Sequence, residues 1–199
     1  MSSNVRKLRV LGISGSLRQG SFNTAALRAA AELAPDYMTI EIADISALPL
    51  YNDDVRQAGY PAPVEAFRRQ IAEVDAVLFA TPEYNYSISG VLKNAIDWAS
   101  RPPAQPFEGK PVAIMGASGS VLGTARAQYH LRQMLVFLNA FPVNKPEVFI
   151  AQAAQKFDAA GKLTDETARD LISKLLVSLA EWTLRLKQPA PELPVAKSA

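Results

Sequence analysis

Small residues, hydroxyls and one guanidinium gather in the segment 12–23, which reads GISGSLRQGSFN. The segment joins an apolar run to a helical pattern, so its polar side chains lie in the loop between an expected strand and an expected helix. The free N–H groups at the start of a helix attract an anion, and serine hydroxyls and Arg18 add further donors. These residue types in this order predict a phosphate-binding loop.

Two familiar phosphate motifs do not describe this loop. The dinucleotide fingerprint G-x-G-x-x-G does not occur in it. The P-loop pattern is matched from Gly15 to Gly20, but Ser21-Phe22 stands where Lys-Ser/Thr is required, which argues against a nucleoside triphosphatase. A simpler alternative is a Ser/Gly turn closed by an asparagine cap, with no ligand.

Two further segments have unusual compositions. Residues 81–90 read TPEYNYSISG, and their tyrosines and amide would suit a flat heteroaromatic ring. Glu83 could act there as a general acid or base, or could only favour the positive end of the next helix. Residues 116–123 read GASGSVLG, whose small side chains would let a ring edge reach the backbone, or would serve a tight turn alone.

These three segments each follow an apolar run, and apolar runs alternate with helical patterns along the chain. The alternation predicts an α/β fold: a flavodoxin-like, doubly wound, five-stranded parallel sheet of order 2-1-3-4-5 with helices on both faces. The expected strands are 8–13, 38–43, 76–80, 111–115 and 147–150. The expected helices are 23–33, 63–73, 88–100, 123–138 and 164–186, the last with a weak capping signal at Thr164.

In such sheets, ligands bind beyond the carboxyl ends of the strands, where the three segments lie. A phosphate at the first segment and a flat ring between the other two describe a mononucleotide, and FMN fits best. The longer connections 48–62 and 101–109 are expected to be lids or contact surfaces.

Composition narrows the class of protein. With 199 residues, 49% of them hydrophobic, we expect one domain over 1–188 and a mobile tail over 189–199. The 21 basic and 19 acidic residues give a net charge of +2, too small to indicate nucleic-acid binding. No apolar run predicts a membrane span and no targeting segment is evident, so we expect a cytoplasmic protein. The chain has no cysteine and one histidine, His130, which excludes thiolate chemistry and multi-histidine metal sites; no metal is expected.

Residues 15–23, 82–87 and 90–98 resemble the NADPH-dependent FMN reductases, most closely the bacterial chromate and quinone reductases. The stretches 128–133 and 144–147 resemble that branch as well, and the resemblance covers about residues 8–187. It implies a flavodoxin-like dimer or tetramer with the flavin near a subunit interface.

The resemblance also implies site residues. Four would hold the FMN phosphate: Ser16, Arg18, Ser21 and Asn23. Gly15 belongs to the same loop, and the isoalloxazine would lie against Pro82, Glu83, Tyr84 and Asn85, with Ser118 at its pyrimidine edge. Candidates for the subunit interface or for the nicotinamide nucleotide are Tyr51, Asn52, Asp53 and Arg101.

The family's chemistry implies that FMN takes a hydride from NADPH or NADH and reduces a small acceptor in the same place, a ping-pong mechanism. The acceptor would be a quinone, chromate, an azo dye or free flavin. Since the chemistry lies on FMN, no catalytic side chain is expected, and His130 is expected on a helix surface or at an interface. A flavodoxin-type electron carrier and an FMN-binding regulatory protein are the alternatives. The balanced charge favours the enzyme, because carriers that dock on basic partners are usually strongly acidic.

Overall fold

The structure, a computed structural model, describes residues 6–188; the tail 189–199, predicted to be mobile, lies outside them. The strands are β1 (Leu8–Ser14), β2 (Met38–Ala43), β3 (Ala76–Ala80), β4 (Pro111–Ala117), β5 (Phe141–Pro142) and β6 (Val148–Ile150). The helices are α1 (Phe22–Glu32), α2 (Asp53–Ala58), α3 (Ala62–Glu73), α4 (Gly90–Ala99), α5 (Ala125–Phe137) and α6 (Glu166–Leu186), with a 3-10 turn at Ala153–Gln155.

The strands form one parallel sheet in the order β2-β1-β3-β4-β5, which confirms the predicted flavodoxin-like α/β fold. The fifth position of the sheet is divided between two short strands. β5 pairs with Pro111 and Val112 at the start of β4, and β6 pairs with residues 115–117 at its end. Pro142 and Pro146 have no backbone N–H to donate, which limits hydrogen bonding to β4 in the stretch from β5 to β6.

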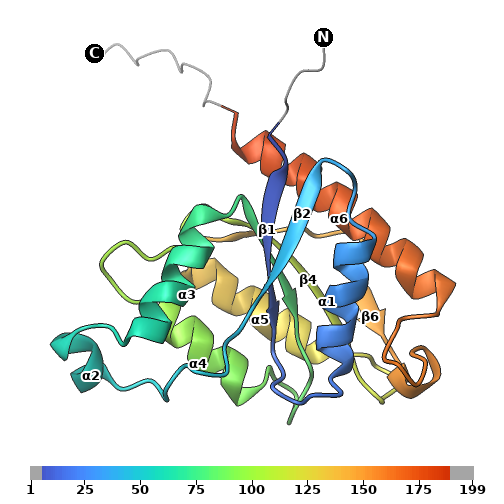
Figure 1. Cartoon of the computed structure of the whole chain (residues 1–199), viewed down its shortest axis with the longest axis horizontal. Helices are drawn as coiled ribbons and strands as arrows, with labels where there is room; N and C mark the ends of the chain where they lie inside the picture. The colour runs from blue at the N-terminus through green and yellow to red at the C-terminus, as the bar shows by residue number, and fades with distance from the viewer. Residues whose placement is uncertain (1–5, 189–199) are drawn as a thin grey trace, which may run out of the picture.

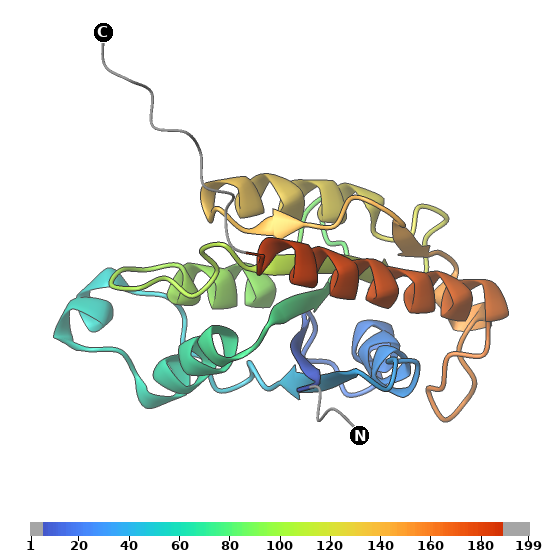
Figure 2. The ribbon, with the colours of Figure 1, turned by 90° about the horizontal axis from the view of Figure 1, so that it is seen from above.

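Alternate side chains of the central strands enter two separate cores. Leu78 packs with α1 and α6 on one face, and its neighbours Val77 and Phe79 pack with α3, α4 and α5 on the other. In Figure 1, α1 lies to the right of the strands and α3 and α4 to the left, while α6 runs from above the strands toward the right. Figure 2 shows α6 in the middle of the molecule, with α5 along one side and α1 and α3 toward the other. Burial on both faces explains why β3 is apolar at every position.

Two sequence predictions about helix boundaries are wrong. The segment 48–62, expected to be a loop, contains the helix α2, which begins after Asn52 and buries none of its residues. Such a helix has no apolar stripe to reveal it. The last helix is capped by Asp165, not Thr164: the Asp165 carboxylate accepts a hydrogen bond from the Ala168 N–H at 2.8 Å.

The helices α1, α4 and α5 begin at the same edge of the sheet, beyond the carboxyl ends of β1, β3 and β4 (bottom of Figure 1). Serine caps fix two of these starts. Ser21 accepts from the Thr24 N–H at 3.3 Å, and Ser89 accepts from the Leu92 N–H at 3.2 Å. No helix within residues 6–188 is long and apolar enough to cross a membrane.

Candidate functional site

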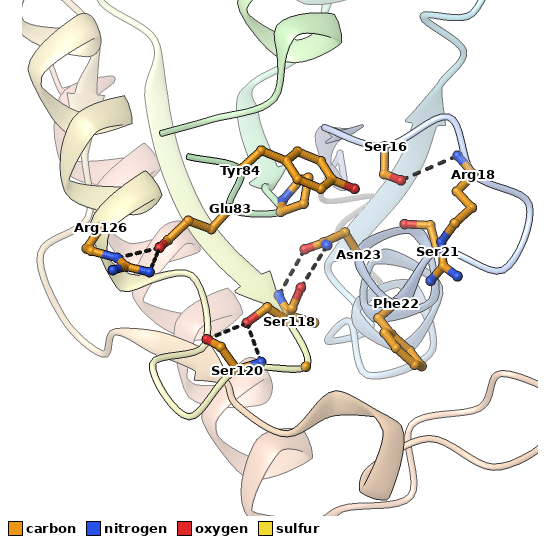
Figure 3. A pocket seen from close by; sticks show the side chains of 13 residues that line it. Ser16, Arg18, Ser21, Phe22, Asn23, Glu83, Tyr84, Ser118, Ser120 and Arg126 are labelled. Atoms are coloured by element: carbon orange, nitrogen blue, oxygen red, sulfur yellow. Dashed lines mark hydrogen bonds and ion pairs between the residues drawn. The ribbon is translucent and has the colours of Figure 1, made fainter. Parts of the chain in front are cut away.

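Three loops enclose a cavity of about 370 Å³ at this edge of the sheet (Figure 3). We call them loop one (15–21), loop two (81–89) and loop three (118–124). Most of the residues predicted to bind the cofactor line the cavity: Ser16, Arg18, Ser21, Asn23, Pro82, Glu83, Tyr84 and Ser118. The cavity is also lined by five residues that were not predicted as ligands: Phe22, Ala117, Gly119, Ser120 and Arg126.

Loop one presents hydroxyls and a guanidinium at the start of α1. The Arg18 Nη2 donates to the Gly20 carbonyl at 2.7 Å, and its guanidinium lies over the Phe22 ring at 5.7 Å from the centroid. The Arg18 N–H points at the Ser16 hydroxyl, 3.4 Å away. The loop therefore holds its arginine close to the first helical turn, beside N–H groups that could receive an anion.

Gly15 does not line the cavity but sets the distance between loops one and two. A Cβ on Gly15 would stand 2.8 Å from Pro82 Cδ, closer than real Cβ atoms approach. The Ser89 hydroxyl also donates to the Gly15 carbonyl at 2.5 Å. Loop two can lie against loop one only because residue 15 has no side chain.

Asn23 has a different set of contacts from the one its sequence context suggests. The residue is 3% exposed, and its Nδ2 donates to the Ala117 carbonyl while its Oδ1 accepts from the Ala117 N–H, both at 2.9 Å. Its side chain thus ties α1 to the end of β4. A contact between Asn23 and a phosphate stays a prediction.

Loop two folds back on itself in a tight turn. The Tyr84 N–H donates to the Ser87 carbonyl at 3.0 Å, and the Ser87 N–H donates to the Tyr84 carbonyl at 2.9 Å. Asn85 and Tyr86, at the tip, have positive φ angles of 49° and 67°. The turn directs the Tyr84 ring toward the cavity and leaves Asn85 exposed outside it.

The Glu83 carboxylate is engaged by the first turn of α5. It forms an ion pair with Arg126, and its Oε2 accepts from the Ala127 N–H at 3.2 Å. The Glu83 side chain is only 6% exposed, and its hydrogen bond raises the pKa of Arg126. Arg126 also lies over the Tyr86 ring, 3.7 Å from the centroid. Glu83 is thus an acid at the positive end of a helix, but that helix is α5 and not α4, the next helix along the chain.

Loop three is held by the segment that follows β6. The Ser118 N–H donates to the Ile150 carbonyl at 3.0 Å, and the Ala153 N–H donates to the Ser118 carbonyl at 3.0 Å. The Ser118 hydroxyl donates to the Gly123 carbonyl. Beneath the loop, a Cβ on Gly116 would stand 1.9 Å from Thr124 Oγ1, so this glycine allows α5 to pack against β4. A rigid floor of backbone and small side chains results.

Arg126 is the chief residue of the cavity that sequence reasoning missed. Its position in the sequence could have indicated it, because it lies in the first turn of the helix after loop three, at the edge of the sheet where ligands bind. Because the charge of Glu83 is balanced by Arg126, the charge of Arg18 is left in excess among the lining residues, which favours an anionic ligand.

The four interface or nucleotide candidates form a separate cluster around α2, at the outer end of the molecule (Figure 2). The Tyr51 hydroxyl donates to Asp53 at 2.7 Å, and Arg101 lies over the Tyr51 ring at 5.8 Å. Arg56 Nε donates to Asp53 at 2.6 Å, and Arg56 together with Tyr51 holds the pKa of Asp53 well below its usual range. Asn52 accepts from the Asp54 N–H as the cap of α2. None of the four lines the cavity.

His130 lies exposed on α5, as predicted for a helix-surface residue. Its Nδ1 is 2.8 Å from the Ser87 hydroxyl, so it touches the outer side of loop two. Within residues 6–188, no cluster of three or more histidine, aspartate or glutamate side chains could hold a metal ion.

An α/β sheet with a phosphate-type loop and an open ring-sized cavity at its carboxyl edge defines a flavodoxin-like nucleotide-binding protein. Residues 8–155 match the model of the NADPH-dependent FMN reductase family. The chain belongs to that family, and it is therefore an oxidoreductase that uses FMN and NAD(P)H.

Individual relatives are similar over nearly their whole length. The chain is 63% identical to an NAD(P)H-dependent FMN reductase of Pseudomonas aeruginosa, over 90% of this chain and 97% of the relative. It is 47% identical to a quinone reductase of Escherichia coli, over 91% and 98%. Among solved structures, FerB, a flavoenzyme NAD(P)H:(acceptor) oxidoreductase from Paracoccus denitrificans, is 36% identical with a TM-score of 0.81, over 89% of this chain and 98% of that one.

Proposed function

We propose that this chain holds FMN in the cavity and uses it to pass electrons from NAD(P)H to quinones. The observation that carries the proposal is that the two ends of one cavity differ. Loop one offers hydrogen-bond donors for an anion, and loops two and three offer flat or small residues. The cavity volume of about 370 Å³ falls within the range of about 300–1,000 Å³ found for small-molecule sites.

The phosphate of FMN would be held at loop one. Ser16 and Ser21 offer hydroxyls there, Arg18 offers a charge, and the start of α1 offers backbone N–H groups. Hydrogen bonds between a phosphate and charged or backbone donors are among the strongest in proteins. The part proposed for Asn23 is to keep α1 beside loop three, so that the phosphate end and the ring end stay at a fixed distance.

The flavin ring would lie between loops two and three. Pro82 and the Tyr84 ring supply flat apolar surface, and Ser118 and Gly119 leave room for the ring edge to reach backbone groups. The Glu83–Arg126 pair fixes loop two against α5 and presents no unpaired carboxylate beneath the ring.

Bound FMN supplies the redox chemistry, the acceptance and release of two electrons, which amino-acid side chains cannot perform. The side chains around the cavity bind and orient, and none is proposed as a catalytic acid or base. NAD(P)H and the acceptor would both have to reach the same flavin ring between loops two and three, so they would bind in turn, which supports a ping-pong mechanism.

Quinones are the first acceptors we propose, since relatives at 47–50% identity are named quinone reductases. Chromate, azo dyes and free flavin are further candidates.

We also propose that the chain forms a homodimer or homotetramer. Large apolar side chains stand exposed beside the cavity: Tyr84 is 56% exposed, Tyr86 71% and Val121 75%. Exposed large apolar side chains on neighbouring loops are candidates for a protein contact. Light scattering at assay concentration tests the proposal, and a monomer would reject it.

Steady-state kinetics tests the proposed reaction. With NADPH and benzoquinone both varied, we expect rapid turnover and parallel double-reciprocal lines. Intersecting lines would reject the ping-pong order, and turnover with chromate but not with quinone would reassign the acceptor.

A further inference from the structure

A second cavity borders loop one, between α1 and the segment that follows β2. Its volume is about 290 Å³, and it shares Ser16 and Arg18 with the first cavity, so the two are neighbours. Its lining includes Leu17, Arg18, Arg28, Ile42, Asp44 and Ser46. Nothing in the proposed binding of FMN uses the α1 and β2 side of this cavity.

The lining combines three kinds of chemistry. Leu17 and Ile42 are apolar yet 50% and 37% exposed, and they give the cavity apolar surface. Asp44 supplies a carboxylate directly after the end of β2, and Arg28 supplies an exposed guanidinium from α1. A base, a ribose and a phosphate would each find a partner of the right type there.

Asp44 and Arg28 differ in how the surrounding residues engage their side chains. Hydrogen bonds from Ser46, including one from its N–H at 2.8 Å, lower the pKa of Asp44 and keep its carboxylate ionised. Arg28 takes part in none of the ion pairs found within residues 6–188. Arg18 is tied to the Gly20 carbonyl on the same loop. Arg28 is therefore the cation available for a ligand on this side.

We propose that this second cavity binds the adenosine 2′-phosphate end of NADPH. Arg28 contacts the 2′-phosphate, Asp44 accepts from a ribose hydroxyl, and the adenine lies against Leu17 and Ile42. In dinucleotide-binding α/β sheets an acidic residue after the second strand meets the ribose, and a nearby arginine accommodates a 2′-phosphate. The inference rests on the proposed function, since the nicotinamide half must reach the first cavity next door.

The size and place of the cavity favour half a dinucleotide over a whole ligand. Its volume lies at the lower end of small-molecule sites, so it would enclose one nucleoside with its phosphate. The two cavities share a border at Ser16 and Arg18, so a nucleotide held in the second cavity would lie directly beside FMN held in the first.

Opposite substitutions in the cavity test the proposal on FMN-loaded protein. Arg28→Gln should lower the ratio of kcat/KM for NADPH to that for NADH by about tenfold, because a hydrogen-bonded charge is lost. Asp44→Asn should raise the same ratio by about threefold, because a carboxylate no longer repels the 2′-phosphate. Arg69→Gln, an exposed arginine of α3 outside both cavities, is the matched control and should leave the ratio unchanged.

Calorimetry gives a readout without turnover. Adenosine 2′,5′-bisphosphate should bind FMN-loaded protein more tightly than adenosine 5′-monophosphate, and Arg28→Gln should remove about tenfold of that preference. An equal ratio in Arg28→Gln and Arg69→Gln, or equal binding of the two nucleotides, would overturn the proposal. A failure of the proposed function looks different, because neither nicotinamide nucleotide would then reduce the flavin in the unsubstituted protein.

Discussion

The side-chain amide of Asn23 joins two elements that are 94 positions apart in the sequence. Its two hydrogen bonds, both 2.9 Å long, reach the N–H and the carbonyl of Ala117. Asn23 belongs to α1, which begins at the phosphate-type loop, and Ala117 ends β4, immediately before loop three. One buried side chain thus fixes the distance between the two ends of the cavity.

Replacing this side chain should loosen both the fold and the site. Asn23→Ala leaves the buried N–H and carbonyl of Ala117 without partners, so we expect the free energy of unfolding to fall by about 2–4 kcal/mol. FMN affinity should fall with it. Chemical denaturation measures the first quantity, and Asn144→Ala, an exposed asparagine, is a control expected to stay within about 0.5 kcal/mol. A loss no larger than that of the control would contradict the bridging role.

The phosphate role of loop one depends most on Arg18. Arg18→Ala should weaken FMN binding by about 1.5–3 kcal/mol, the range for hydrogen bonds to charged groups. Fluorescence titration of the apoprotein with FMN measures the dissociation constant. Arg69→Ala removes an equal charge from the surface of α3 and controls for net charge. An unchanged constant in Arg18→Ala would remove this residue from the site.

Substitution of Glu83 tests whether its carboxylate has a structural or a catalytic role. Its contacts with Arg126 and the Ala127 N–H predict that Glu83→Gln lowers stability by about 1–3 kcal/mol and kcat by less than tenfold. Loss of a general acid or base would instead lower kcat by about 100-fold or more. Stopped-flow and steady-state rates decide between them. Arg126→Gln removes the other half of the pair and should destabilise the protein by a similar amount.

The sequence predicted the sheet order and the loops of the cavity because both depend on local patterns. Apolar runs mark buried strands, and small polar segments mark the turns at their carboxyl ends. The contacts of Asn23 and Arg126 depend on residues far away in the chain. No local pattern around Asn23 includes Ala117, so the bridge between these two residues could not be predicted from the sequence.

Three further features of the structure differ from the sequence predictions because the local sequence did not determine them. Thr164 and Asp165 are both good caps, and in the structure the second caps α6. The helix α2 buries no residue and therefore carries no hydrophobic period. The divided fifth strand follows from Pro142 and Pro146, whose effect on the ladder depends on where β4 lies.

Asp165 gives the stability a predictable pH dependence. The Ala168 N–H lowers the pKa of this carboxyl, and Lys156 adds to the effect. A lowered pKa means that the ionised cap stabilises the fold above the unfolded value of about 3.9, and that this contribution is lost as the pH falls through the folded value.

Asp165→Ala should therefore cost about 1 kcal/mol at pH 7. Its difference from the unsubstituted protein should shrink below about pH 4. Urea denaturation between pH 3 and pH 7 measures this difference. Asp165→Asn keeps a capping oxygen and should lie closer to the unsubstituted protein at pH 7. A constant difference between Asp165→Ala and the unsubstituted protein across the range would contradict the assignment.

In the proposed function, NAD(P)H reduces FMN bound to this chain with no partner protein. The most direct test is the anaerobic visible spectrum of FMN-loaded protein before and after one equivalent of NADPH. We expect the flavin absorbance band to disappear, and to return when benzoquinone is added. A band that persists with both NADPH and NADH, despite tight FMN binding, would contradict the proposed function and favour an electron carrier or a regulatory protein.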